Sequence, residues 1–290
     1  MATLRAAGIL TVFIVVTCVL IPVQWAALKL HAGWRRSLPH AYHRFLCRLI
    51  GVRITVLGTA VEGGVLITAN HTGWLDIPIL SAVMPVSFVA KQEVGAWQFF
   101  GTLARLQRTI FIRRERAKAL EDRDTIRRRL SDGDALVIFP EGTSTDGNRV
   151  LSFKSALLSA AELPLGEGEG KHAIHAPVQP VSVAYVGLHG LPMGRENRPF
   201  FAWYGDMELV PHLWEAFEMG PIDVIVELHK PLTVDEAGGR KELAAAAEAA
   251  VRDGVVRALS GAHALPAPPH HDEELIEALG EDDSDTEEAA

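Results

Sequence analysis

Residues 65–76 read Val65-Leu66-Ile67-Thr68-Ala69-Asn70-His71-Thr72-Gly73-Trp74-Leu75-Asp76, an apolar, β-branched run followed at once by a polar turn. The run Val65–Thr68 predicts a buried strand, and Ile77-Pro78-Ile79-Leu80 predicts a helix that begins near the proline. On one continuous helix, side chains five residues apart diverge by roughly 140°. We therefore expect a strand-to-helix turn to bring His71 and Asp76 together.

A histidine beside an aspartate is a common arrangement of a general base and the group that orients it. Histidine is the side chain whose unperturbed pKa, about 6.5, lies nearest neutral pH, and a buried aspartate fixes its tautomer and stabilises its protonated form. In this turn we expect Asn70 to act as a cap and Gly73 to permit the bend. The pair predicts removal of a proton from a hydroxyl. A histidine that is hydrogen-bonded only for structural reasons has the same signal, so a second element is needed.

A second polar loop follows another apolar strand. Ala135–Ile138 is typical of a strand buried on both faces of an α/β sheet, and Phe139-Pro140-Glu141-Gly142-Thr143-Ser144 comes directly after it. Loops at strand ends form the ligand crevice of such sheets. This loop offers a carboxylate, a glycine that lets the backbone approach closely, and two hydroxyls. Taken alone, it is also consistent with a tight turn that has no chemical role.

Together the two segments resemble the glycerolipid acyltransferase family, whose signature is N-H-x-x-x-x-D followed by F-P-E-G-T. Asn70–Asp76 and Phe139–Thr143 stand here in that order. Two weaker family blocks match at Thr109–Arg114 and Val178–Val181. The resemblance covers roughly Arg53 to Leu232 and implies an α/β fold, a mixed sheet layered with helices.

The resemblance implies a mechanism of acyl transfer. His71, held by Asp76, would take the proton from an acceptor hydroxyl while that oxygen attacks the thioester carbonyl of acyl-CoA or of an acylated carrier protein. No cofactor and no metal are implied. In the family, the E-G-T segment and the motif arginine are associated with the acceptor head group, and nearby basic side chains would add to them. The substrate-binding residues expected on this basis are Arg113, Arg114, Glu141, Gly142, Thr143 and Lys154.

The acceptor is less sharply defined, because the chain departs from the family pattern in two places. Many lysophosphatidic acid acyltransferases carry arginine after E-G-T where this chain has Ser144, and Gln107-Arg108 replaces a family glycine. The run Glu141–Ser155 resembles a bacterial subgroup that includes lyso-ornithine lipid acyltransferases, whose acceptor has a carboxylate and an amine. Arg113-Arg114 favours 1-acyl-sn-glycerol-3-phosphate as acceptor and phosphatidic acid as product, with lyso-ornithine lipid as the alternative. The alternative of another class is a non-catalytic, membrane-tethered lipid-binding protein.

The beginning of the chain predicts a membrane anchor. Ala6–Leu28 is a run of 23 residues without a charge, long enough to cross a bilayer core of about 30 Å. A cleaved signal peptide is the alternative, although its apolar core is usually shorter. Only Arg5 precedes the run and many basic residues follow it, which places its C-terminal side in the cytoplasm. We expect a single-pass protein of the cell inner membrane with its catalytic domain on the cytoplasmic face.

The predicted organisation has four parts. They are a transmembrane anchor (1–30), an interfacial basic amphipathic segment (31–52), the acyltransferase domain (53–260) and a disordered acidic tail (261–290). The pattern of Leu38–Val52 fits an ordinary amphipathic core helix equally well. The tail holds ten acidic and no basic side chains between Asp272 and Glu288, which accounts for the net charge of −8.

Several function classes lack their sequence signatures. The basic stretch Arg105–Arg129 contains a single aromatic residue, Phe111, and no nucleic-acid-binding motif, so nucleic acid is not an expected partner. The two cysteines form no C-x-x-C pattern, and H-E-x-x-H, G-x-S-x-G and Gly-rich phosphate loops do not occur. These absences argue against zinc proteases, serine hydrolases and nucleotide-binding enzymes.

Strands that alternate with helices in the region 53–260 predict an α/β sheet. We interpret Trp203-Tyr204 and Pro211–Trp214 as core or interface packing. Strands are expected near Arg53–Leu57, Val65–Thr68, Ser87–Ala90, Thr109–Ile112, Ala135–Phe139, Val178–Tyr185 and Asp223–Leu228, and helices near Ile77–Val83, Ala117–Leu130, Ser155–Glu162 and Arg240–Leu259.

Overall fold

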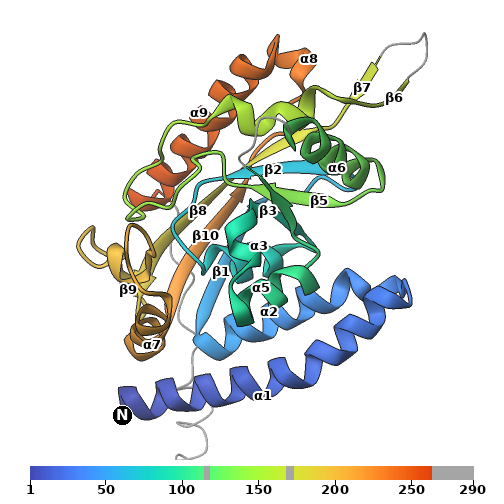
Figure 1. Cartoon of the computed structure of the whole chain (residues 1–290). Coiled ribbons are helices and arrows are strands. Elements are labelled where there is room, and N and C mark those ends of the chain that lie inside the picture. Colours follow the sequence, from blue (N-terminus) through green and yellow to red (C-terminus); the bar gives the residue numbers. More distant parts are fainter. Residues whose placement is uncertain (114–117, 168–172, 263–290) are drawn as a thin grey trace, which may run out of the picture.

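The computed structural model describes residues 1–113, 118–167 and 173–262. Within these residues an eight-stranded mixed sheet forms the centre of the domain, in the order β1-β10-β8-β2-β5-β3-β4 with β9 paired to β8, and β6 pairs with β7 separately (Figure 1). The strands are β1 (Val52–Gly58), β2 (Val65–Ala69), β3 (Ser87–Lys91), β4 (Ile110–Ile112), β5 (Ala135–Ile138), β6 (Pro164–Glu167), β7 (Ala173–His175), β8 (Val178–Leu188), β9 (Leu191–Pro192) and β10 (Ile222–Leu228).

Helices cover both faces of this sheet. On one side α9 packs along β8, and on the other α2 and α3 pack against each other and against β1. The helices are α1 (Ala2–Lys29), α2 (Ser37–Ile50), α3 (Asp76–Val83), α4 (Gln92–Gly95), α5 (Gln98–Leu106), α6 (Ala119–Ser131), α7 (Leu209–Met219), α8 (Val234–Ala237) and α9 (Arg240–Leu259), with 3-10 helices η1 (Gly33–Arg35), η3 (Ser155–Glu162) and η5 (Arg198–Phe201).

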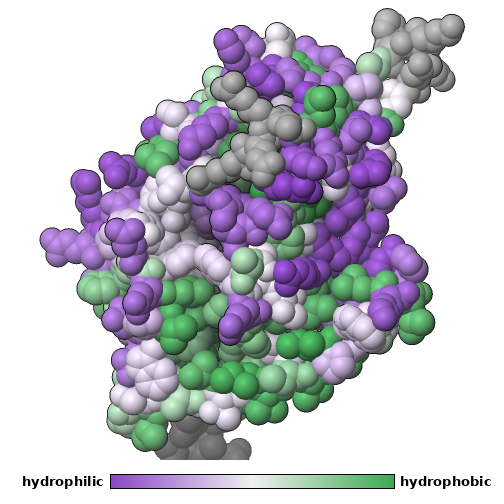
Figure 2. All heavy atoms as spheres, in the orientation of Figure 1, coloured by the Kyte–Doolittle hydropathy of each residue, from purple (hydrophilic) through white to green (hydrophobic). Residues whose placement is uncertain are grey.

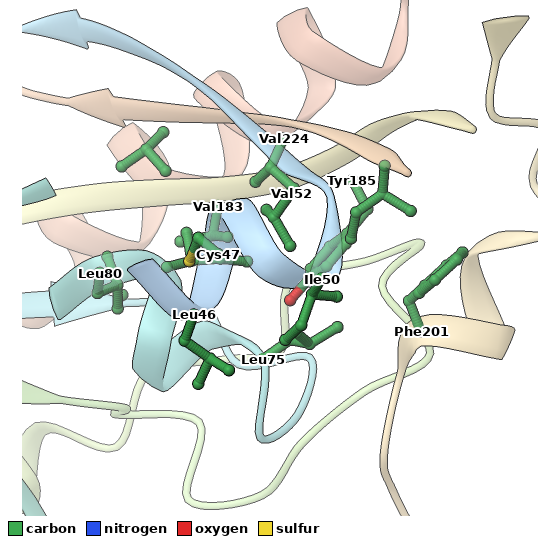
Figure 3. Close-up of a cluster of buried hydrophobic side chains, with 14 of the residues drawn as sticks. Leu46, Cys47, Ile50, Val52, Leu75, Leu80, Val183, Tyr185, Phe201 and Val224 are labelled. Carbon is green, nitrogen blue, oxygen red and sulfur yellow. The ribbon is translucent and has the colours of Figure 1, made fainter. Parts of the chain in front are cut away.

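The apolar runs of the sequence supply a core on each face of the sheet. Successive strand residues point to opposite faces, so Val65 and Ile67 join one cluster while Leu66 between them joins the other. Figure 3 shows the first cluster, in which Cys47 of α2 and Val183 of β8 lie together. The sheet is therefore buried on both faces, which explains its continuous rather than alternating hydrophobic strands.

Strand direction places the two sequence motifs at one edge. β8, β2, β5, β3 and β4 are parallel neighbours, whereas β10 runs antiparallel to β8 and β1 runs parallel to β10. The loops that follow β2, β5, β3 and β4 therefore all leave the sheet at the same edge. In open α/β sheets this carboxyl edge is where ligands bind.

The predicted α/β class, with a mixed sheet layered with helices, is confirmed. All seven predicted strands are present within a few residues of their expected ends, and α9 has the expected bounds. Ser155–Glu162 forms a 3-10 helix. The sequence interpretation missed α5 and α7, which are both short amphipathic helices. The packing role of Pro211–Trp214 is confirmed, because Leu213 and Trp214 of α7 pack against the core.

Helix α1 is long and apolar enough to cross a membrane, by its length and composition. It also lies along the domain and touches α2, α5 and α7 (Figure 1). Thr17 Oγ1 shares a hydrogen bond of 2.6 Å with the hydroxyl of Tyr42, and Gln24 Nε2 donates to the carbonyl of Leu106 at 2.9 Å. Thr17 and Gln24 of this apolar helix thus face the domain, whereas Thr11 is exposed and bonds to the Ala7 carbonyl of its own helix.

The outer surface of α1 is apolar. Val15, Val19 and Trp25 are more than half exposed, and Figure 2 shows hydrophobic side chains gathered along the lower edge of the molecule, where Figure 1 draws α1. An exposed apolar surface of this kind favours contact with lipid. The predicted acidic tail lies outside the described residues from 263 onward and stays a prediction, as do the proposed domain boundaries.

Candidate active site

The loop after β2 is fastened to the neighbouring strand by Asn70. The Asn70 Nδ2 atom donates to the Val183 carbonyl at 2.9 Å, and the Val183 amide donates to Asn70 Oδ1 at 2.8 Å. The expectation that Asn70 caps the following helix is not what the structure shows, because Leu75 occupies that position and no side chain caps α3. Asn70 acts instead as a clamp between β2 and β8.

The strand-to-helix turn brings His71 and Asp76 into contact. His71 Nδ1 lies 2.8 Å from Asp76 Oδ2, and Asp76 is completely buried at the first residue of α3. The same carboxylate oxygen accepts hydrogen bonds from the amides of Thr72 and Gly73 at 2.6 and 3.0 Å. The turn therefore wraps around the carboxylate, which holds the imidazole in one orientation. Its Nε2 atom has no hydrogen-bond partner among the described residues.

Gly73 is required at its position for a reason other than flexibility. A Cβ atom there would lie 2.7 Å from the backbone nitrogen of Trp203, which no side chain tolerates. The Trp203 amide uses this closeness to donate to the Thr72 carbonyl at 2.9 Å. The segment around Trp203 is thereby held against the His71 turn.

Tyr185 of β8 completes the surroundings of Asp76, and the sequence interpretation missed it. Its hydroxyl donates to Asp76 Oδ1 at 2.8 Å from a fully buried position, visible among the core residues of Figure 3. Burial, together with the nearby Asp76 carboxylate, raises the pKa of Tyr185 well above its usual value, so this hydroxyl stays a donor. The available sequence signal was its place on β8, two residues beyond Val183 on the same face.

Glu141 has a different position from the one expected of a head-group ligand. Its carboxylate is buried and accepts two backbone hydrogen bonds, from the amide of His71 at 3.0 Å and from that of Leu151 at 3.1 Å. Burial raises the pKa of Glu141 to about 7 even though both hydrogen bonds favour the charged form. The side chain therefore ties the E-G-T loop to the His71 turn from behind.

Ser144, which stands where many relatives of the predicted family have arginine, also has a structural contact. Its hydroxyl donates to the Trp203 carbonyl at 2.6 Å. Thr145 adds a second link, because its amide donates to the His71 carbonyl at 2.9 Å. The E-G-T loop, the His71 turn and the Trp203 segment form one hydrogen-bonded unit.

An apolar cavity of about 980 Å³ opens beside His71. The imidazole is 23% exposed and stacks on Phe139 with ring centroids 3.9 Å apart, so its remaining surface faces this cavity. Apolar side chains of α1, α2 and α5 line it. Trp203, interpreted from the sequence as a packing residue, also lines it. A space of this size and composition suits a hydrocarbon chain.

The other predicted substrate-binding residues divide into three groups. Arg113, Gly142, Thr143 and Lys154 line the cavity, and Glu141 lies behind it. Arg114 falls outside the described residues. The described ranges contain no group of three or more histidine, cysteine, aspartate or glutamate side chains placed to hold a metal ion.

The geometry is suited to general base catalysis at a lipid-sized site. A buried carboxylate orients the imidazole, and the free ring nitrogen faces a cavity with apolar walls. A similar-looking cluster elsewhere lacks this access, since Ser182 Oγ lies 2.6 Å from His229 Nε2 but is buried beneath α9. Only the first arrangement, among the described residues, reaches the large cavity.

Comparison with known proteins identifies the family of the chain. Residues 52–184 match the Acyltransferase family. The chain is 44% identical over 261 residues to a lyso-ornithine lipid O-acyltransferase of Brucella abortus, covering 89% of this chain and 97% of the relative. It is 42% identical over 232 residues to a protein of the same name from Rhizobium meliloti, covering 79% and 78%.

A solved structure shares the fold. The 1-acyl-sn-glycerophosphate acyltransferase PlsC of Thermotoga maritima superposes with a TM-score of 0.61 at 20% identity, over 89% of this chain and 97% of that one. The chain belongs to the acyltransferase family and is an acyltransferase of lipid metabolism.

Proposed function

We propose that this chain is a lyso-ornithine lipid O-acyltransferase. The choice of lyso-ornithine lipid as acceptor rests on the high identity to two relatives of that name over most of their length. Ser144 supports it, because the position after E-G-T makes a hydrogen bond to backbone and offers no guanidinium to a phosphate. The preference for 1-acyl-sn-glycerol-3-phosphate that we drew from Arg113-Arg114 thus gives way to the alternative acceptor.

In the proposed reaction, His71 Nε2 accepts the proton of the acceptor hydroxyl as that oxygen attacks the thioester carbonyl. The new C–O bond forms, the C–S bond breaks, and the imidazolium returns the proton to the leaving thiolate. Asp76 stabilises the imidazolium, which it contacts through Nδ1 at 2.8 Å. General base help of this kind typically accelerates a reaction by about 10² to 10⁴.

The acyl chain would occupy the apolar part of the cavity. Leu20 and Ile21 of α1 and Leu46 of α2 contribute to its wall, so the anchor helix forms part of the binding site. Lipid substrates could then enter from the bilayer without crossing water. We propose that the domain acts at the cytoplasmic face of the inner membrane, where acyl-CoA and acylated carrier protein are found.

The test is an acceptor-by-donor assay with the purified full chain in detergent micelles. Lyso-ornithine lipid and lysophosphatidic acid are each offered with acyl-CoA and with acylated carrier protein, and His71→Ala serves as the catalytic control. We expect ester formation on lyso-ornithine lipid, lost in the variant. Transfer to lysophosphatidic acid alone would overturn the acceptor. Binding of lipid with no transfer under any combination would support the non-catalytic lipid-binding alternative.

A further inference from the structure

The mouth of the cavity carries charges of both signs. Among the described residues that line it, Lys91, Arg113 and Lys154 are cationic and Glu93 is the carboxylate. Glu93 follows the end of β3 and is exposed, in the short helix α4. A site built only for a phosphate dianion gains nothing from a carboxylate in its wall, because like charges repel.

The sheet topology places these groups beside His71. β2, β5 and β3 are consecutive parallel strands, and their carboxyl ends lead to His71, to Gly142 and to Glu93 respectively. Lys154 belongs to the middle group, because its Nζ atom lies only 2.7 Å from where a Cβ of Gly142 would stand. Along this edge of the sheet the base His71 therefore comes first, the cation Lys154 second and the carboxylate Glu93 third.

Neither flanking charge is neutralised within the described part of the chain. No ion pair or side-chain hydrogen bond of Glu93 or Lys154 occurs there, whereas Glu141 is fully engaged by backbone amides. Both side chains are exposed at the rim of the cavity. They are available to a ligand.

We propose that Glu93 binds the ammonium group and Lys154 the carboxylate of a zwitterionic acceptor head group. This rests on the proposed function, and it assigns the recognition of ornithine to two named residues. An amine is the feature that distinguishes this head group from a phosphate, so Glu93 would be the residue that selects the acceptor.

The distances along the sheet edge fit such a head group. Adjacent strands lie about 4.8 Å apart, so β3 is about 10 Å from β2. In a lyso-ornithine lipid, about nine bonds separate the reacting hydroxyl from the side-chain ammonium and about seven separate it from a carboxylate oxygen. At about 3.5 Å for three bonds of extended chain, these spans are about 10 and 8 Å. The carboxylate thus reaches the Lys154 loop and the ammonium reaches Glu93.

The test crosses two variants with two acceptors in the full-length enzyme. Glu93→Gln and Lys154→Gln are assayed on lyso-ornithine lipid and on the analogue whose side-chain amine is acetylated. Glu93→Gln removes the charge on the proposed hydrogen bond to the ammonium group. We therefore expect it to lower kcat/KM for lyso-ornithine lipid by about tenfold, mainly through KM. The same variant should leave kcat/KM for the acetylated analogue unchanged. Lys154→Gln should lower kcat/KM equally for both acceptors, since both keep the carboxylate.

Glu62→Gln is the matched control, an exposed glutamate in the loop before β2, at the opposite edge of the sheet. If Glu93→Gln lowered kcat/KM equally on both acceptors, or on neither, the role of Glu93 would be overturned. Wild-type enzyme that acylates lysophosphatidic acid and not lyso-ornithine lipid would overturn the proposed function itself. In that case, a higher kcat/KM of Glu93→Gln than of wild type on lysophosphatidic acid would show that Glu93 faces the head group without binding an amine. This result also overturns the inference.

Discussion

Two histidine–aspartate pairs in this chain have almost the same Nδ1–Oδ2 distance and lie in different surroundings. His71 and Asp76 are joined at 2.8 Å in the turn after β2, and His175 of β7 and Asp235 of α8 are joined at 2.7 Å. The side chain of Asp76 is completely buried, whereas that of Asp235 is 64% exposed. A short distance between imidazole and carboxylate is therefore common to both.

What differs is everything around the contact. Asp76 also accepts from two amides and from Tyr185, and its histidine faces a cavity of about 980 Å³. For the second pair, no further side-chain hydrogen bond of Asp235 and no contact with the large cavity occurs within the described residues. The comparison teaches that preorganisation and access, more than the pair itself, define the base.

The largest effect is expected from His71→Ala. Loss of the base should lower kcat by about 10² to 10⁴, because the imidazole that Asp76 orients toward the cavity is removed. Steady-state acyl transfer, with expression and melting temperature as controls, measures it. Retention of more than a tenth of wild-type kcat would contradict the assignment of His71 as the base.

Asp76→Asn should lower kcat by somewhat less, on the order of 10². The amide keeps the shape of the carboxylate but does not stabilise an imidazolium, and its NH₂ group opposes one of the present donors. The measurement is kcat and KM on the same acceptor. A change confined to KM would mean that Asp76 supports binding rather than the proton transfer.

Glu141→Gln should change the pH dependence of stability. Since the pKa of Glu141 is raised to about 7, the native state binds more protons than the unfolded chain between roughly pH 4.5 and 7. This group therefore makes the free energy of unfolding fall as pH rises through that window, by on the order of 3 kcal/mol, with no further fall above pH 7. Thermal unfolding in detergent from pH 4 to 8 should show this fall in wild type and lack it in the variant. If the melting temperatures of wild type and variant changed with pH in parallel, the raised pKa of Glu141 would be refuted.

Tyr185→Phe should have a moderate effect, a fall in kcat of about fivefold with KM unchanged. The ring stays in the core, but Asp76 Oδ1 loses its donor, so the carboxylate holds the imidazole less firmly in the orientation for proton transfer. Steady-state kcat and KM, with the melting temperature of the variant, measure it. A lower melting temperature with an unchanged kcat would indicate that Tyr185 serves only packing.

The smallest effect is expected from Asp235→Asn, the counterpart of Asp76→Asn. Exposed ion pairs contribute about 0 to 1 kcal/mol, so stability should change by less than about 1 kcal/mol and kcat should stay the same. The same assays are used side by side. A loss of kcat comparable to that of Asp76→Asn would erase the distinction between the two pairs.

The sequence anticipated the fold where a strong local pattern existed. The apolar runs at 65–68 and 135–138 became β2 and β5, and the polar segments after them became neighbouring loops at one edge of the sheet. α5 and α7 were missed although their apolar residues recur at helical spacing, because each helix is short and contains a residue typical of breaks, Gly101 in α5 and Pro211 in α7.

Contacts between distant residues were beyond the sequence. Asn70 was expected to cap a helix and instead clamps Val183, 113 residues away, and Glu141 was expected at the head group and instead holds the amides of His71 and Leu151. Nothing local distinguishes these uses, since the same side chains serve caps, ligands and clamps equally well.

By itself, then, the sequence determined the family, the α/β class and the identity of the histidine and its carboxylate, because each depends on residue types at short spacing. The tertiary structure alone decided that Tyr185 supports Asp76, that α1 helps to enclose the cavity, and that Glu93 shares its rim with Lys154. The physical reason is that register and helix docking set which side chains meet from distant parts of the chain, such as Tyr185 and Asp76, which are 109 residues apart. Only the folded sheet specifies that register.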